Sequence, residues 1–292
     1  MGSAVDEIRG QLKYIGIKES EFDGFESFIM EVDKNISVED IILSEGNKKK
    51  IEQFKLEQEN KEKLIAYKLY PINRLLLYGA SGTGKTMLAK ALSNYFNYTL
   101  LYIDIAQSLE QDTVAKNISN IFKLANTIGS CIIFLDECDA IAWSRDSAAS
   151  DSINRRIATN SLFQQLDQMN KTNIFISATN MIYRIDYAFE RRFNMKMEFT
   201  RPKNKLDDSI KRFMREDFEL VDDIQNNVKH LIERRIKESV KMSYYTIEVI
   251  TEKAMKRAIM ENTNKVKLSW IFGDLADEEK MNIEIIPIEN RV

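Results

Sequence analysis

Glycine and proline are scarce in this chain of 292 residues, which contains only 10 Gly and 3 Pro. Together they make up about 4% of the residues, against an average near 12% in proteins. This scarcity argues against a fold with many tight turns and predicts a helix-rich chain. Three of the glycines, Gly79, Gly82 and Gly84, fall within six residues, which indicates that the chain needs glycine at this place.

Cysteine and histidine are also scarce, with two Cys and one His in the whole chain. Cys131 and Cys138 cannot form a disulfide framework, and their spacing matches no zinc-binding pattern. His230 lies in a polar helical stretch and is expected to face solvent. The sequence therefore offers no catalytic histidine and no zinc site, and we expect a reducing, cytoplasmic location.

The charges nearly balance, since 42 basic and 45 acidic residues give a net charge of −3. A near-neutral chain has no bulk electrostatic reason to bind nucleic acid or an anionic membrane. No stretch approaches the roughly 18 uncharged apolar residues that a membrane-spanning helix needs. Residues 1–10 also lack the apolar core of a signal peptide. We therefore expect neither a membrane nor a nucleic acid as partner.

The pattern along the chain predicts three parts. Residues 1–36 are expected to form a charged helical arm, residues 37–201 an α/β domain, and residues 202–292 a small all-helical domain with an extended tail. In the middle part, helical stretches alternate with five short apolar runs, at residues 75–78, 100–103, 131–135, 174–176 and 195–199. Continuous apolar runs are typical of strands buried on both faces, so the predicted fold is α/β, with a parallel sheet of about five strands covered by helices.

Residues 79–86 read GASGTGKT and fit the phosphate-loop pattern G-x-x-x-x-G-K-[ST] between a predicted strand and a predicted helix. Glycines let backbone N–H groups surround a phosphate, and the following helix directs its positive end to the same anion. Lys85 adds a charge for the β- and γ-phosphates, and the Thr86 hydroxyl is a ligand for Mg²⁺. The predicted nucleotide-binding residues are Gly79, Ser81, Gly82, Thr83, Gly84, Lys85, Thr86 and Met87.

Two carboxylates, Asp136 and Glu137, end the third apolar run. A buried strand has no packing reason to end this way, because a desolvated carboxylate is costly unless it is paired or holds a metal. Ligands of open parallel sheets bind at the carboxyl ends of the strands. We therefore expect Asp136 to meet the Mg²⁺ held by Thr86, and Glu137 to polarise the attacking water.

These motifs, in this order, resemble the AAA+ ATPase family over roughly residues 37–265. The resemblance implies that Asn180 orients the attacking water and that residues 38–42, with Ile41, hold adenine. It also implies an arginine finger for the neighbouring subunit's ATP, with Arg192 favoured slightly over Arg191 because it directly precedes Phe193. The alternative is that both arginines pair with local acids. The helical part after Pro202 is similar to the family's lid domain.

Finer likenesses point to one branch of the family. The run Ala178-Thr179-Asn180 and the lack of an evident sensor arginine in the lid resemble the protein-remodelling members. Residues 154–167 resemble bacterial members that are encoded beside subtilisin-like proteases. Two departures stand out: Leu109–Asp112 carries neither the aromatic residue nor the glycine usual in protein-threading members, and the finger loop lacks its usual glycine.

The resemblance implies a Mg²⁺-dependent ATP hydrolase that forms a homo-oligomeric ring, expected to be a hexamer, and remodels or disassembles a protein partner. Two alternatives remain open at this point. One is an ATP-gated scaffold or signalling switch that does not thread its partner, favoured by the missing aromatic residue at 109–112. The other is a DNA-acting initiator or loader, against which the net charge argues.

Overall fold

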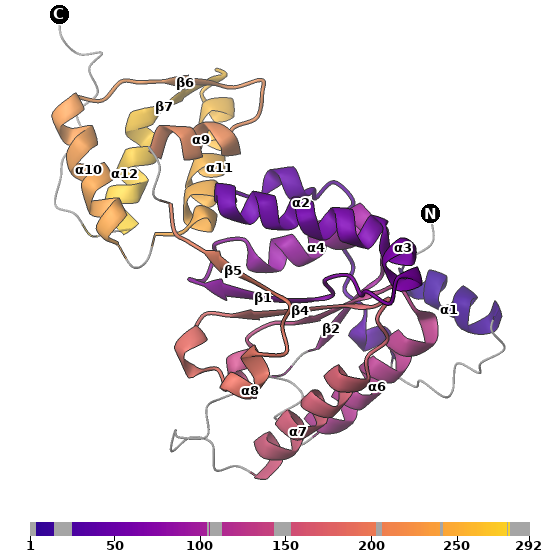
Figure 1. Ribbon diagram of the computed structural model, residues 1–292. Helices are drawn as coiled ribbons and strands as arrows, with labels where there is room; N and C mark the ends of the chain where they lie inside the picture. The colour runs from indigo at the N-terminus through magenta and orange to yellow at the C-terminus, as the bar shows by residue number, and fades with distance from the viewer. Residues whose placement is uncertain are drawn as a thin grey trace, which may run out of the picture. The chain divides into compact units, whose positions relative to one another are not determined.

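The computed structural model describes residues 4–14, 25–103, 105, 113–142, 153–202, 206–239, 242–278 and 280. They form two compact units (Figure 1). The first unit contains Met1–Gly79 and Gly84–Phe199, and the second contains Ala80–Thr83 and Thr200–Val292. None of the helices in the described ranges is long and apolar enough to cross a membrane.

The first unit is built on a five-stranded parallel sheet, as the apolar runs predicted. The strands are β1 (Arg74–Gly79), β2 (Leu100–Ile103), β3 (Ile132–Leu135), β4 (Ile174–Thr179) and β5 (Met195–Phe199). Their order across the sheet is β2-β3-β4-β1-β5, so β3, β4 and β1 are neighbours. The register pairs Leu135 with Ser177 and Leu77 with Ala178. The carboxyl ends of these three parallel strands therefore lie together at the same end of the sheet.

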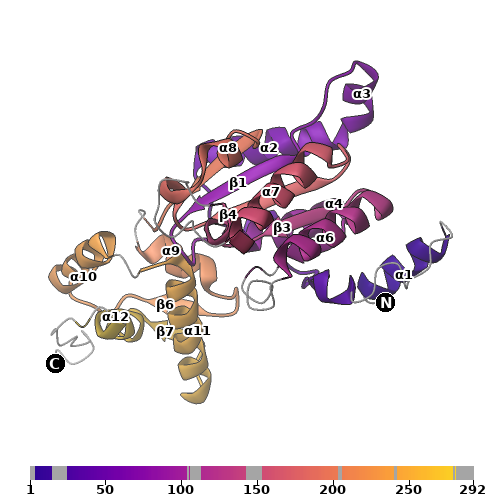
Figure 2. The same ribbon diagram turned by 90° about the horizontal axis from the view of Figure 1, so that it is seen from below.

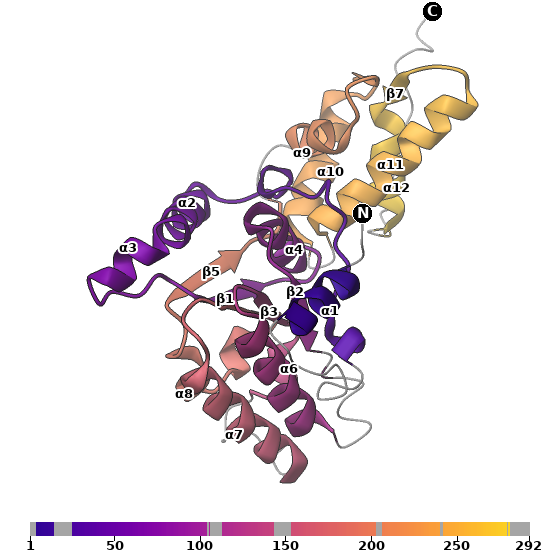
Figure 3. The same ribbon diagram turned by 90° about the vertical axis from the view of Figure 1, so that its right-hand side faces the viewer.

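Helices cover both faces of the sheet, so the first unit has three layers (Figure 3). Alternate strand residues face opposite sides: Leu75 and Leu77 lie in one buried cluster, and Leu76 lies in the other. The cluster of Leu75 includes residues of α2 (Glu45–Glu59) and α4 (Lys85–Phe96). The cluster of Leu76 includes residues of α6 (Val114–Ile128) and α7 (Ile153–Gln168), which lie side by side in Figure 2. This two-sided burial explains why the strands are apolar without alternation.

Further helices and 3₁₀ turns complete the first unit. Helix α2 is followed by α3 (Lys61–Ala66), and Asn60 lies between the two. A 3₁₀ turn, η3 (Val38–Asp40), precedes α2, and α8 (Tyr187–Glu190) lies between β4 and β5. Further 3₁₀ turns are η2 (Phe25–Phe28), η4 (Cys138–Ala140) and η6 (Ile182–Arg184).

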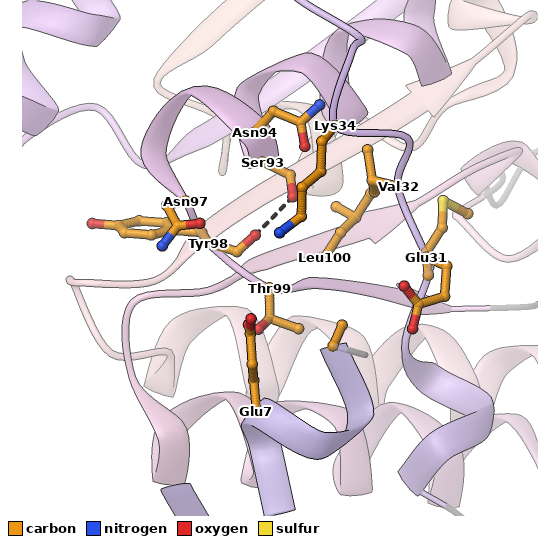
Figure 4. Close-up of a pocket in the computed structure, with 12 residues that line it drawn as sticks. Glu7, Glu31, Val32, Lys34, Ser93, Asn94, Asn97, Tyr98, Thr99 and Leu100 are labelled. Atoms are coloured by element: carbon orange, nitrogen blue, oxygen red, sulfur yellow. Dashed lines mark hydrogen bonds between the residues drawn. The ribbon is translucent and has the colours of Figure 1, made fainter. Parts of the chain in front are cut away.

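The N-terminal segment packs on the edge strand β2. Helix α1 (Ala4–Tyr14) buries Ile8 and Leu12 in the cluster that contains Leu101. Beyond it, Ile29 forms an antiparallel bridge with Leu101. Because an edge strand exposes unpaired backbone groups, this bridge shields part of the edge. A polar cavity of about 320 Å³ lies beside this contact, and none of the predicted site residues lines it. Its lining residues are drawn in Figure 4.

The second unit is mostly helical, with α9 (Leu206–Phe213), α10 (Asn226–Glu238), α11 (Tyr244–Met260) and α12 (Leu268–Glu278) around one buried cluster. The expectation of an all-helical unit missed a two-stranded parallel sheet of β6 (Glu219–Val221) and β7 (Lys265–Lys267). Each strand has three residues, which is too short for a periodic pattern. Buried Asp223 accepts hydrogen bonds from the backbone N–H of Ser269, at 2.7 Å, and from its hydroxyl, at 2.6 Å.

Candidate nucleotide site

The phosphate loop connects β1 to α4, and three of its glycines have positive φ. These are Gly79 (φ +141°), Gly82 (φ +69°) and Gly84 (φ +100°), a backbone region that side chains other than glycine rarely adopt. A Cβ atom on Gly79 would lie 2.0 Å from the carbonyl oxygen of Phe199 on β5. The concentration of glycine in this segment therefore has two physical causes, backbone conformation and close approach between chain segments.

Lys85 lies at the first position of α4 and is buried, with 6% of its surface exposed. Its Nζ donates to the carbonyl oxygen of Gly79 at 2.8 Å and to Oδ1 of Asn180 at 2.7 Å. Burial lowers the pKa of Lys85, while the carboxylates of Asp136 and Asp139 oppose that shift. The ammonium is thus a partly desolvated charge at the carboxyl ends of β1 and β4, where an anionic ligand would stabilise it.

The two residues predicted to hold Mg²⁺ are in direct contact. The hydroxyl of Thr86, on the first turn of α4, donates to Oδ2 of Asp136 at 2.8 Å. Asp136 follows β3, and its Oδ1 accepts the backbone N–H of Glu137 at 2.9 Å. A hydroxyl and a carboxylate are hard oxygen donors that suit Mg²⁺, which usually completes its shell with phosphate oxygens and water. Among the described residues, no group of three or more His, Cys, Asp or Glu gathers to hold a metal, so protein ligands alone would not complete such a site.

Glu137 has a left-handed backbone conformation, with φ 50° and ψ 43°. This conformation is uncommon for a residue other than glycine, asparagine or aspartate, and such outliers often occur at functional sites. Glu137 is exposed, whereas its neighbour Asp136 is half-buried. A carboxylate in this position is accessible to water, as a general base must be.

Asp139 is one acidic neighbour that the sequence analysis did not select. Its Oδ1 accepts a hydrogen bond from the hydroxyl of Thr179 at 2.6 Å, which connects the turn after β3 to the end of β4. The sequence carried a weak signal for it, an acidic residue one turn beyond Asp136. Cys138, between them, is fully buried, and burial raises its pKa to about 12, so it is no nucleophile.

The remaining predicted nucleotide residues surround the loop in different ways. Ile41 is buried, and its Cγ2 lies 3.2 Å from the position that a Cβ on Gly84 would take. Met87 is half-buried on α4, and Ser81 is exposed. Thr83 is buried and donates from its hydroxyl to the carbonyl oxygen of Ala80 at 2.7 Å. Ile41 thus lies beside the Gly84 end of the loop, and its part in holding adenine stays a prediction.

The two arginines after α8 have different surroundings. Arg192 donates from Nε and Nη2 to both carboxylate oxygens of Asp167, at 3.1 and 3.0 Å, and its Nη1 donates to the carbonyl oxygen of Ala188 at 2.6 Å. Its guanidinium also lies 4.3 Å from the ring centre of Phe163 on α7. The hydrogen bond from Arg192 lowers the pKa of Asp167. Arg191, by contrast, is exposed.

Several sequence expectations concern residues outside the described ranges. They are the loop Leu109–Asp112 and the extended tail after residue 280. His230 lies in the described part, and its side chain is 80% exposed, as its polar surroundings predicted.

Comparison with known proteins places these motifs in a family. Residues 75–201 match the family described as "ATPase family associated with various cellular activities (AAA)". A homolog of a 26S proteasome regulatory subunit from Methanothermobacter thermautotrophicus is 31% identical over 205 residues, which cover 68% of this chain and 52% of that protein. Vacuolar protein sorting-associated protein 4 of Dictyostelium discoideum is 34% identical over 132 residues, covering 44% of this chain and 29% of that protein.

The fold is shared with solved structures of AAA domains. The crystal structure of the FIGL-1 AAA domain superposes with a TM-score of 0.66 and 21% identity, covering 94% of this chain and 92% of that one. The match to the proteasome-subunit homolog spans about half of that protein's length.

The role of Gly79 can be tested by comparing it with Gly129, which also has a positive φ, +66°, but has no atom within 4 Å of an added Cβ. We expect Gly79→Ala to lower the free energy of unfolding by about 3 kcal/mol or more, because strain and overlap add. Gly129→Ala should cost less, about 1–2 kcal/mol, for backbone strain alone, because its φ of 66° and ψ of 162° lie in a region that is almost restricted to glycine. Urea denaturation measures both, and equal losses would show that the approach to Phe199 does not constrain the loop.

The family match and the site geometry concern the same residues, since the phosphate loop, the acidic pair and Asn180 all lie within the matched range. Residues 75–201 of this chain therefore match an ATPase domain of the AAA family.

Proposed function

We propose that this chain hydrolyses ATP with Mg²⁺ and that its subunits assemble into a ring in which neighbours share each active site. The observation that carries the proposal is the gathering of Lys85, Thr86, Asp136 and Asn180, joined by two hydrogen bonds of 2.7 and 2.8 Å. These residues come from the ends of three neighbouring strands, which is where open α/β sheets bind ligands.

Each residue has a distinct part in the proposed reaction. Lys85 binds the β- and γ-phosphates, and Thr86 and Asp136 hold the Mg²⁺, whose charge offsets the negative charge of the transferring phosphoryl group. Glu137 accepts a proton from the attacking water. Asn180 orients that water. The hydrogen bond between Asn180 and Lys85 holds the Asn180 side chain near the phosphate that Lys85 binds. The donor groups of this site suit both ATP and Mg²⁺.

The proposed catalytic base is tested by Glu137→Gln, which keeps the shape of the side chain and removes its basicity. We expect ATP turnover to fall at least about a hundredfold, since general bases contribute roughly 10²–10⁴ in rate. Nucleotide affinity should stay within about twofold, because Lys85 and Thr86 are unchanged. Turnover is measured by phosphate release and affinity by fluorescent ADP. A variant that hydrolyses ATP at the wild-type rate would exclude this role.

The arginine that acts on a neighbouring subunit's ATP is, in our proposal, Arg191. An arginine finger must reach away from its own subunit, whereas Arg192 is bound to Asp167, Ala188 and Phe163 within its own subunit. Arg191 follows α8 and is exposed. We therefore assign Arg191 the finger and give Arg192 a structural part. This assignment reverses the slight preference for Arg192 that the sequence suggested. The alternative that the sequence left open, pairing with a local acid, holds for Arg192.

Two alanine variants separate these parts. Arg191→Ala should reduce ATP turnover by about a thousandfold, the lower end of the effect of arginine fingers, without changing the unfolding free energy. Arg192→Ala should instead lower the free energy of unfolding by about 1–2 kcal/mol, because the Asp167 pair is half exposed and part of the loss is packing. The opposite pattern would return the finger to Arg192.

Mixing two inactive variants tests whether Arg191 acts between subunits. An Arg191→Ala subunit keeps Glu137, and a Glu137→Gln subunit keeps Arg191, so a mixed ring restores complete sites. For random one-to-one mixing, roughly a quarter of the wild-type turnover should return. No recovery from stably mixed rings would contradict action between subunits.

We also propose that the ring is hexameric, acts in the cytoplasm and remodels a protein partner. Two free, buried cysteines suit a reducing compartment. Relatives named as a proteasome regulatory subunit homolog and a vacuolar protein sorting protein support a protein as the partner. The likeness of residues 154–167 to bacterial members encoded beside subtilisin-like proteases stays a prediction. A pull-down with Glu137→Gln and ATP, followed by mass spectrometry, identifies the partner.

A further inference from the structure

The phosphate loop does not pack as one piece. Its ends, Gly79 and Gly84, belong to the first unit together with Lys85, whereas Ala80–Thr83 group with the second unit. Within the second unit, the backbone N–H of Tyr245 donates to the carbonyl oxygen of Gly82 at 3.2 Å. The centre of the loop is thus hydrogen-bonded to the first turn of α11.

The contact is close enough to restrict which residues can form it. A Cβ atom on Gly82 would lie 2.5 Å from Oγ of Ser243 and 3.3 Å from Cβ of Tyr245. Ser243 is the N-cap of α11, where its hydroxyl accepts the backbone N–H of Thr246 at 3.2 Å. Gly82 is therefore required at this position both by its positive φ and by the packing of the helix cap against it.

Backbone chemistry gives this contact a role in phosphate binding. A phosphate is bound by backbone N–H groups that point toward it, so the carbonyl groups of the same loop must point elsewhere. The first N–H groups of a helix have no partner within the helix and carry its positive end. The N–H of Tyr245 and the carbonyl of Gly82 satisfy each other, and this bond opposes a rotation that would turn the carbonyl toward the phosphate.

We propose that the backbone N–H of Tyr245 is a positioning group for nucleotide binding, which holds the Gly82 carbonyl on α11 and so keeps the loop's amides directed at phosphate. The inference rests on the proposed function of the loop, which the binding of ADP and Mg²⁺ to the wild-type chain tests on its own.

The test replaces Tyr245 in two ways. Tyr245→Pro removes the N–H at a helical position where proline is tolerated, since it lies in the first turn of α11. Tyr245→Ala is the matched control, because it keeps the N–H and removes a side chain that is 65% exposed. Affinity is measured by titrating fluorescent ADP in the presence of Mg²⁺, and thermal unfolding shows that each variant is folded.

We expect Tyr245→Pro to bind ADP about 3- to 10-fold more weakly than the wild type, the range expected for one hydrogen bond. Tyr245→Ala should bind within about twofold of the wild type. The KM for ATP should rise with the ADP dissociation constant, while kcat changes less than about twofold, because Lys85, Asp136 and Glu137 are untouched. If Tyr245 had only a structural part, its substitution would not raise KM while leaving kcat nearly unchanged.

A backbone ester at position 245 keeps the tyrosine side chain and removes only the N–H. If the proline variant unfolds, the ADP affinity of this ester variant tests the part of the N–H. Wild-type affinity in the ester variant would overturn the proposal. An equal loss of affinity in Tyr245→Ala would also overturn it, because the side chain would then be the cause. If the wild-type chain itself fails to bind ADP, the proposed function fails instead.

Discussion

Parallel pairing of β3 with β4 and of β4 with β1 is the constraint on which the rest of the site depends. The three strands are far apart in the sequence, yet their carboxyl ends meet at one edge of the sheet. Asp136, Asn180 and the phosphate loop each follow directly from one of these ends. The sheet register therefore fixes where each functional segment begins, and the positive φ angles of the loop glycines and of Glu137 shape the segments that follow.

The sheet can impose this register because both of its faces are buried. Leu75, Leu77 and Ile176 pack against α2 and α4, while Leu76 and Phe175 pack against α6 and α7. A shift of one residue in any strand would exchange these faces and disrupt both clusters. The cores thus hold the strand ends in place, and they allow a lysine and a carboxylate to sit close together in partly desolvated surroundings without loss of the fold.

Much of this arrangement could be predicted from the sequence, because its signals are local. The five apolar runs, the glycine-rich loop before Lys85 and the two carboxylates after a buried strand each have a physical cause within a few residues. The sequence did not reveal contacts between distant residues. Examples are the pairing of Arg192 with Asp167, 25 residues apart, and the approach of Gly82 to Ser243. The strands β6 and β7 were missed because three residues carry no period.

We propose above all that the residues at these strand ends bind the phosphates of a Mg²⁺ nucleotide. A crystal structure of the chain with ADP and Mg²⁺ tests this most directly. We expect Lys85 Nζ within hydrogen-bond distance of the β-phosphate and Thr86 Oγ1 as a ligand of the Mg²⁺. A nucleotide bound elsewhere, or one whose phosphates contact neither Lys85 nor the loop amides, would contradict it.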